Sequence, residues 1–180
     1  NRRKFSDEEN KFSSNLIGVK KGKKQNWITK DIYENNNSYY GDLSAIMIDN
    51  LPFWAELSST PSSKVSLISE WEKKVQAIIN ESINQNVTSF AGVPSWMLSL
   101  LQQVIQQTGK DNILEIWKNA EVYFHGGVSF DPYRNLYKNL FPSKDFKYFE
   151  IFNASEGFFA IQDQNNSSEL LLMLDYGIFY

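Results

Sequence analysis

The chain has 180 residues, of which 42% are hydrophobic and 22% charged, so it is long and apolar enough to bury the core of one globular domain. It contains no cysteine and a single histidine, which excludes disulfide bonds, thiolate metal sites and an imidazole-rich zinc site. No run approaches the roughly 20 apolar residues of a membrane span, and the charged start has no signal-peptide core behind it. The sequence therefore predicts a cytoplasmic protein with no membrane partner.

The first 30 residues form a basic segment on an otherwise acidic chain. The net charge is −3, yet residues 1–30 hold nine Lys and Arg against three Asp and Glu. An anionic partner would be attracted to such a segment, but its lysines lack interleaved aromatic residues beyond Trp27. We therefore interpret residues 1–38 as a solvated, basic polar segment containing one strand or loop edge at 16–19, and we predict no nucleic-acid partner.

Two helices are predicted before residue 85. The first is apolar and runs from Asp42 to the Leu51-Pro52 bond. The second opens at Thr60-Pro61, where threonine can cap the helix and proline suits its first turn. Its apolar residues recur at steps of three and four, which predicts one core-facing side: Ile68, Trp71, Val75, Ile78 and Ile79.

Strands and helices alternate from residue 87 onward. Short β-branched or apolar runs predict the strands, while Pro94 and Asp131-Pro132 open the helices. This alternation predicts an α/β fold with a mostly parallel sheet, right-handed crossovers, helices on both faces and extra strands at the C-terminal end. The expected strands are 87–91, 121–124, 147–152, 157–162 and 170–180, and the expected helices are 94–108 and 131–140.

A pair of glycines follows the second of these strands. In open parallel sheets, ligands bind beyond the carboxyl ends of the strands, and this is where Gly126 and Gly127 are expected. Paired glycines let a flat ring or a phosphate approach the backbone closely. Two glycines that only form a turn are an equally good interpretation.

A second loop is expected after the strand at 147–152. Phe152 offers an aromatic face for adenine, Ser155 a hydroxyl for a phosphate oxygen, and Glu156 a carboxylate for a magnesium ion that bridges phosphates. The alternative is that Phe152 lies in the core and Glu156 is a surface charge.

The order of these two loops is similar to that of the adenylate-forming superfamily, which includes acyl-CoA synthetases and firefly luciferase. More closely, three segments resemble bacterial members of the auxin-responsive promoter family of acyl acid amido synthetases: Tyr39 to Ala45, Gly92 to Trp96, and Phe152 to Gly157. The run Ile116-Trp117-Lys118-Asn119 also resembles the Leu-Trp-Pro-Asn of the plant relatives. The resemblance covers residues 39–180.

This resemblance implies an enzyme that uses ATP and Mg²⁺ to adenylate a carboxylic acid and then transfers the acyl group to an amino acid. It also implies roles for individual residues. Gly126, Gly127 and Val128 would line the adenine site, Phe152 would replace the usual tyrosine, Asn153 and Ala154 would shape the loop, Ser155 would contact the α-phosphate, and Glu156 would bind Mg²⁺.

Other parts of the family pattern have no counterpart in these residues: the Ser/Thr/Gly-rich phosphate loop, the motif whose aspartate holds ribose, and the mobile C-terminal domain. Residues 39–180 are therefore expected to be the central portion of an adenylation domain. We expect the chain to belong to a longer protein and to be inactive without the rest of it. The alternatives are an acyl-CoA ligase that uses the same adenylate, and a non-catalytic binding module that keeps the fold.

Three further residues are candidates for the substrate pocket. His125 precedes the glycines and could contact the acyl substrate or a phosphate, or it could bond to a neighbouring carbonyl. Ser95 and Trp96 begin the helix after Pro94 and could form the wall of an acyl pocket. Core packing is an equally good interpretation of Trp96.

Overall fold

The computed structural model describes residues 48, 50–66, 68, 70–154, 156–165 and 167–179. The strand or loop edge expected at 16–19 and most of the helix expected from Asp42 lie outside these residues, although Ile48 is helical. Within the described part, five strands form one sheet in the order β1-β2-β3-β4-β5. The first three strands build the parallel half of this sheet, and the last two build an antiparallel half.

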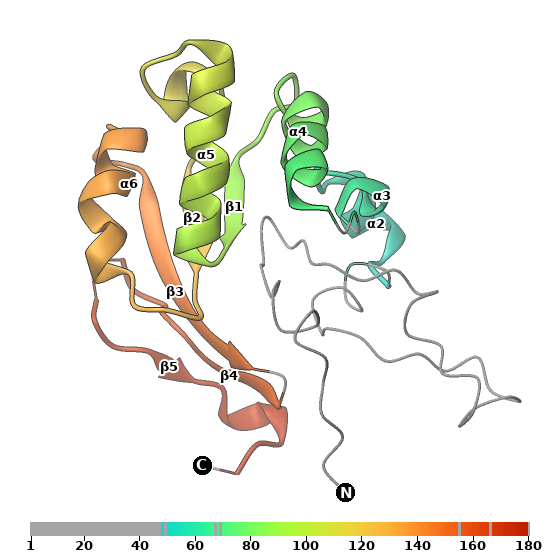
Figure 1. Ribbon diagram of the computed structural model, residues 1–180. Helices are drawn as coiled ribbons and strands as arrows, with labels where there is room; N and C mark the ends of the chain where they lie inside the picture. The colour runs from blue at the N-terminus through green and yellow to red at the C-terminus, as the bar shows by residue number, and fades with distance from the viewer. Residues whose placement is uncertain are drawn as a thin grey trace, which may run out of the picture.

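The parallel half consists of β1 (Ser89–Gly92), β2 (Val122–His125) and β3 (Lys147–Ala154). Helix α5 (Pro94–Thr108) links β1 to β2, and the 3₁₀ turn η4 (Asp131–Tyr133) with α6 (Arg134–Leu140) links β2 to β3. These two units confirm the predicted alternation of strands and helices. Both helices lie on the same face of the sheet (Figure 1). Two right-handed crossovers that proceed in the same direction across a sheet must share a face. The expected arrangement, with helices on both faces, is therefore not the one that α5 and α6 form.

The antiparallel half consists of β4 (Gly157–Ile161) and β5 (Leu171–Leu172). The sheet is therefore mixed, with two of its four strand pairings parallel and two antiparallel. Figure 1 shows β3 running on past β1 and β2 and carrying β4 beside its far end. The strand expected at 170–180 is limited to β5, because the chain then forms the 3₁₀ turn η5 (Leu174–Tyr176).

The helices before β1 differ from the prediction. Helix α2 (Phe53–Leu57) follows Pro52, and the single helix expected from Thr60-Pro61 is two helices, α3 (Ser63–Ser66) and α4 (Trp71–Ser82). The break lies at Glu70, whose extended backbone (φ −85°, ψ 122°) cannot continue the helical ladder of hydrogen bonds. The apolar spacing predicted the buried side of α4 correctly, because it is formed by Val75, Ile78 and Ile79.

One core joins α4, α5 and α6 to the parallel strands. In α5 the buried residues Met97, Leu100, Leu101 and Val104 repeat at helical spacing, as predicted, and Gly109 ends the helix with φ 63°. The other buried apolar residues come from the strands, from α6 and from the segments between them, including the 3₁₀ turn η3 (Ile113–Glu115). Those with the largest side chains are Phe90, Ile113, Trp117, Tyr123, Phe130, Tyr137, Phe141 and Phe146.

Candidate functional site

The carboxyl ends of the three parallel strands meet at one edge of the sheet. Gly92 of β1, His125 of β2 and Glu150 of β3 lie side by side in the strand register. Gly126 continues from β2 directly against β3, since a Cβ atom at this position would overlap the carbonyl oxygen of Ile151. A glycine is therefore required at position 126 by the close approach of the β2 and β3 backbones, whether or not a turn also requires it.

Two buried tyrosines hold the turn after β1 beside these glycines. The Tyr123 hydroxyl donates to the Gly92 carbonyl at 2.8 Å, and the Tyr137 hydroxyl donates to the Pro94 carbonyl at 2.8 Å. Burial raises the pKa of both phenols, so both keep their protons and act as donors. Between the two carbonyls, the Val93 side chain lies against Gly127, which has φ 82°. The aromatic core thus positions the glycine turn.

Phe152, Asn153 and Ala154 lie in strand β3, and not in a loop after it. Phe152 pairs with Ala160 and Asn153 with Phe158 of β4, because the antiparallel partner extends β3 beyond the point where β2 ends. Phe152 is 55% exposed, and its ring lies 5.2 Å from that of Phe159. Phe152 directly follows Ile151, whose carbonyl oxygen lies against Gly126, so the exposed Phe152 is next in the chain to the contact between the glycine turn and β3.

Glu156 is a turn residue just before β4, and Ser155 falls outside the described residues. The Glu156 side chain is exposed. At a strand rise of roughly 3.3 Å per residue, the end of β3 at Ala154 is about 7 Å beyond Phe152 along the strand. Glu156 is therefore displaced from the glycine turn along the hairpin. Val128, on the far side of the glycines, is also exposed.

Ser95 and Trp96 occupy the first turn of α5. Ser95 is exposed, whereas Trp96 is partly buried against the core. The Trp96 ring meets Trp71 of α4 edge to face, with centroids 4.9 Å apart. Trp96 therefore joins α4 to α5, in line with the packing interpretation, and the pocket role of both residues stays a prediction.

His125 is 3% exposed and stacks on Phe130, with ring centroids 4.0 Å apart and planes 16° from parallel. Its Nδ1 atom is buried and has no hydrogen-bond partner in the described part of the chain, so this nitrogen is not bonded to a neighbouring carbonyl. Burial, and to a smaller extent the nearby charge of Arg134, lower the pKa of His125 to about 4. The imidazole is therefore neutral at physiological pH.

This buried imidazole predicts a loss of stability in mild acid. The unfolded chain binds a proton on His125 near pH 6.5, whereas the folded chain binds it only near pH 4. Stability from this residue is complete above pH 6.5 and is lost as the pH falls toward 4, by about 3 kcal/mol in the free energy of unfolding. Urea unfolding at pH 7.5 and 4.5 measures the loss. The His125→Phe variant keeps a ring on Phe130 and should lose less; equal losses in both proteins would contradict the prediction.

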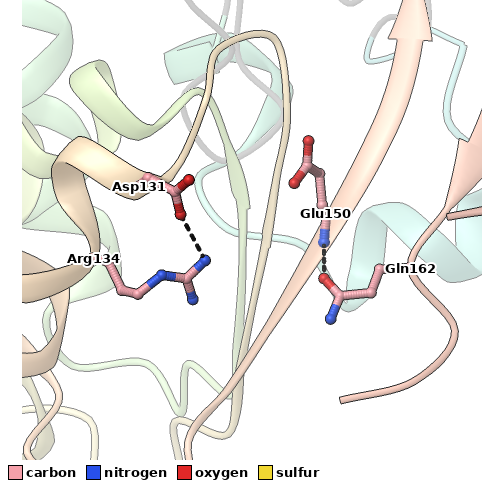
Figure 2. A network of polar contacts seen from close by, with 4 residues as sticks. All are labelled: Asp131, Arg134, Glu150 and Gln162. Carbon is pink, nitrogen blue, oxygen red and sulfur yellow. Dashed lines mark hydrogen bonds and ion pairs between the residues drawn. The ribbon is translucent and has the colours of Figure 1, made fainter. Parts of the chain in front are cut away.

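Four residues of this region carried no signal of a functional role in the sequence: Asp131, Arg134, Glu150 and Gln162. Figure 2 shows them as two pairs. The Arg134 guanidinium lies 3.1 Å from Asp131, and the buried Gln162 side chain accepts from the Glu150 backbone N–H at 3.0 Å. The first pair is local, three residues apart, whereas the second depends on the fold, because Gln162 lies beyond β4 and reaches Glu150 only through the antiparallel hairpin.

A scan against protein-family models matches the chain to the GH3 family N-terminal domain over residues 11–146. The chain belongs to the GH3 family. Members of the GH3 family are adenylating acyl acid amido synthetases, which form amides, so the resemblance drawn from the motifs is confirmed. The match begins well before Tyr39 and ends just before β3, so the Phe152–Gly157 segment lies outside it. Searches of curated proteins and of solved structures gave no match.

GH3 family membership implies ATP, a carboxylic acid and an amino acid as substrates. Among the described residues, no cluster of three or more His, Asp or Glu side chains is arranged to hold a metal ion. A magnesium ion bound with ATP needs only one or two protein carboxylates, because phosphates and water supply its other ligands. Glu156 is exposed, and its role as such a ligand stays a prediction. In the same part of the chain, no helix has the length and apolar character required to cross a membrane.

Proposed function

We propose that this chain is the central part of the adenylation domain of an ATP-dependent acyl acid amido synthetase. Membership of the GH3 family supports the reaction class. The observation that carries the assignment of the site is the contact of Gly126 with the backbone of β3, one residue before the exposed ring of Phe152. In the proposed adenine site a purine would stack on the exposed ring of Phe152, beside the glycine turn.

The proposed reaction has two steps. An oxygen of the substrate carboxylate attacks the α-phosphorus of ATP and pyrophosphate leaves, which produces an acyl-adenylate. The amino group of an amino acid then attacks the acyl carbon, AMP leaves, and an amide forms. Negative charge gathers on the phosphate oxygens in the first step, and the site must stabilise it. We assign this to Glu156, which would hold a Mg²⁺ ion that supplies positive charge, and to Ser155, whose hydroxyl would donate a hydrogen bond.

Removing the Glu156 carboxylate tests this assignment. In the full-length protein we expect Glu156→Ala to slow acid-dependent exchange of pyrophosphate into ATP by about a hundredfold, because one electrostatic contact to the transition state is lost. The matched control is Glu121→Ala, which removes an exposed carboxylate from the residue before β2, at the opposite edge of the sheet. Unchanged exchange in Glu156→Ala, or an equal loss in Glu121→Ala, would show that Glu156 has no special role.

The same protein separates the alternatives by its products. An amide formed with an amino acid supports the proposed function, whereas a thioester formed with coenzyme A indicates an acyl-CoA ligase. A protein that binds ATP but exchanges no pyrophosphate with a broad set of carboxylic acids is a binding module. A Ser155→Ala variant that forms adenylate at the normal rate would remove Ser155 from the proposal.

A further inference from the structure

We propose that Arg134 binds an oxyanion of a substrate, a carboxylate or a phosphate group, at the carboxyl edge of the parallel strands. The inference rests on the proposed function and extends it to a residue outside the motifs that the sequence singled out. Arg134 begins α6, directly after the 3₁₀ turn that follows the glycine loop. The positively charged residues other than Arg134 in the described part of the chain are lysines, which lie on α3, on α4, in the middle of α6, or on the amino-end side of the sheet.

The Arg134 side chain is held in place while most of its donors stay free. Its guanidinium carbon lies 5.2 Å from the centre of the Phe130 ring, and one nitrogen contacts Asp131 Oδ1 at 3.1 Å. The side chain is 49% exposed, and this is its one hydrogen bond in the described part of the chain. A guanidinium has five N–H donors in a planar fork that matches the paired oxygens of a carboxylate or phosphate. Stacking on Phe130 orients the fork without using these donors.

Two side chains that pack against Phe130 each have a buried polar atom without a hydrogen-bond partner. The Nδ1 atom of His125 and the hydroxyl of Tyr148 have no hydrogen-bond partner in the described residues, and their rings lie 4.0 Å and 5.2 Å from that of Phe130. The charge of Arg134 lowers the pKa of both groups, although burial raises the pKa of Tyr148 to about 12 overall. Buried polar groups in folded proteins usually have partners, so the Tyr148 hydroxyl lacks an acceptor, and the His125 Nδ1 atom lacks one in the tautomer that carries its proton there.

An oxyanion supplies this acceptor. The neutral Tyr148 hydroxyl can donate one hydrogen bond, neutral imidazole carries one N–H, and Arg134 supplies a charged fork. The three side chains come from β2, β3 and α6, and they converge on Phe130 next to Gly126 and Gly127. Neither the glycine turn nor Phe152 provides a positive charge, which a negatively charged substrate group at this edge requires.

The test uses the full-length protein and measures KM for the carboxylic acid, for ATP and for the amino acid separately. We expect Arg134→Gln to raise KM for one of them about thirtyfold, and Arg134→Lys to raise KM for the same substrate by less, because lysine keeps the charge but not the fork. Tyr148→Phe should raise the same KM several-fold. The affected substrate identifies the source of the oxyanion: the acid or amino acid for a carboxylate, ATP for a phosphate.

Lys138→Gln is the matched control, because it removes an exposed positive charge one helical turn further along α6. All three KM values within twofold of normal in Arg134→Gln, or an equal effect in Lys138→Gln, would overturn the inference. If the unmodified protein exchanges no pyrophosphate, the proposed function fails instead. Calorimetric titration with pyrophosphate and with acetate then tests Arg134 alone, and equal binding by the unmodified protein and Arg134→Gln overturns the site.

Discussion

Trp117→Ala is expected to lower the free energy of unfolding by about 4 kcal/mol, more than any other change considered. The Trp117 side chain is 2% exposed, its ring lies 5.6 Å from that of Phe90 in β1, and its indole N–H donates to the Ser82 carbonyl at the end of α4. Truncation leaves a cavity between α4 and the sheet that the surrounding helices cannot fill. Urea unfolding of the two proteins measures the difference.

Two further tryptophan variants separate the causes of this loss. Trp117→Phe keeps most of the packing and should cost about 1 kcal/mol through the hydrogen bond, because the Gln85 N–H still donates to the Ser82 carbonyl. Trp54→Ala removes the same side chain from a position that is 73% exposed and should change stability by less than about 0.5 kcal/mol. A small effect of Trp117→Ala, comparable with that of Trp54→Ala, would contradict the assigned role in the core.

Gly126→Ala is expected to lower the free energy of unfolding by about 3 kcal/mol and to weaken adenylation in the full-length protein. The added methyl group would overlap the Ile151 carbonyl oxygen, which belongs to the backbone and cannot rotate away. Strands β2 and β3 must therefore separate at the edge where the glycine turn lies next to Phe152. Thermal unfolding and pyrophosphate exchange measure the two effects.

Gly109→Ala is the matched control for this glycine, because the two positions differ in the reason for having no side chain. Gly109 has φ 63° and open space around it, whereas Gly126 has no positive φ and lies against β3. Gly109→Ala should cost about 1 kcal/mol of backbone strain and leave exchange unchanged. If Gly126→Ala costs no more than Gly109→Ala, the close approach of the two backbones does not restrict this position.

Helix α5 was predictable from the sequence because all its determinants are local. Pro94 suits the first turn, Gly109 suits a left-handed C-cap, and the apolar residues between them repeat at helical spacing. The break between α3 and α4 was not predictable, because the apolar spacing continues across it through Ile68. The extended backbone of Glu70 overrides that spacing.

The candidate site was predicted only in part. The glycines and the aromatic residue expected after strands indicated that a ligand binds at the carboxyl edge of the sheet. The structure places Gly126 against β3, next to Phe152. The position of Phe152 inside a strand was missed, because the pairing that extends β3 comes from β4, whose own apolar run does not reveal its partner. Arg134 was missed as a candidate site residue because a single arginine at the start of a helix forms no recognisable sequence motif.

The sequence by itself determined the elements from β1 to β3, the βαβ connections and the GH3 family, because these depend on local spacing and on motifs. Only the tertiary structure decided the mixed sheet, the shared face of α5 and α6, and the cluster of His125, Tyr148 and Arg134 on Phe130. The physical reason is that strand pairing and ring packing join residues far apart in the chain. Their geometry follows from which surfaces become buried together.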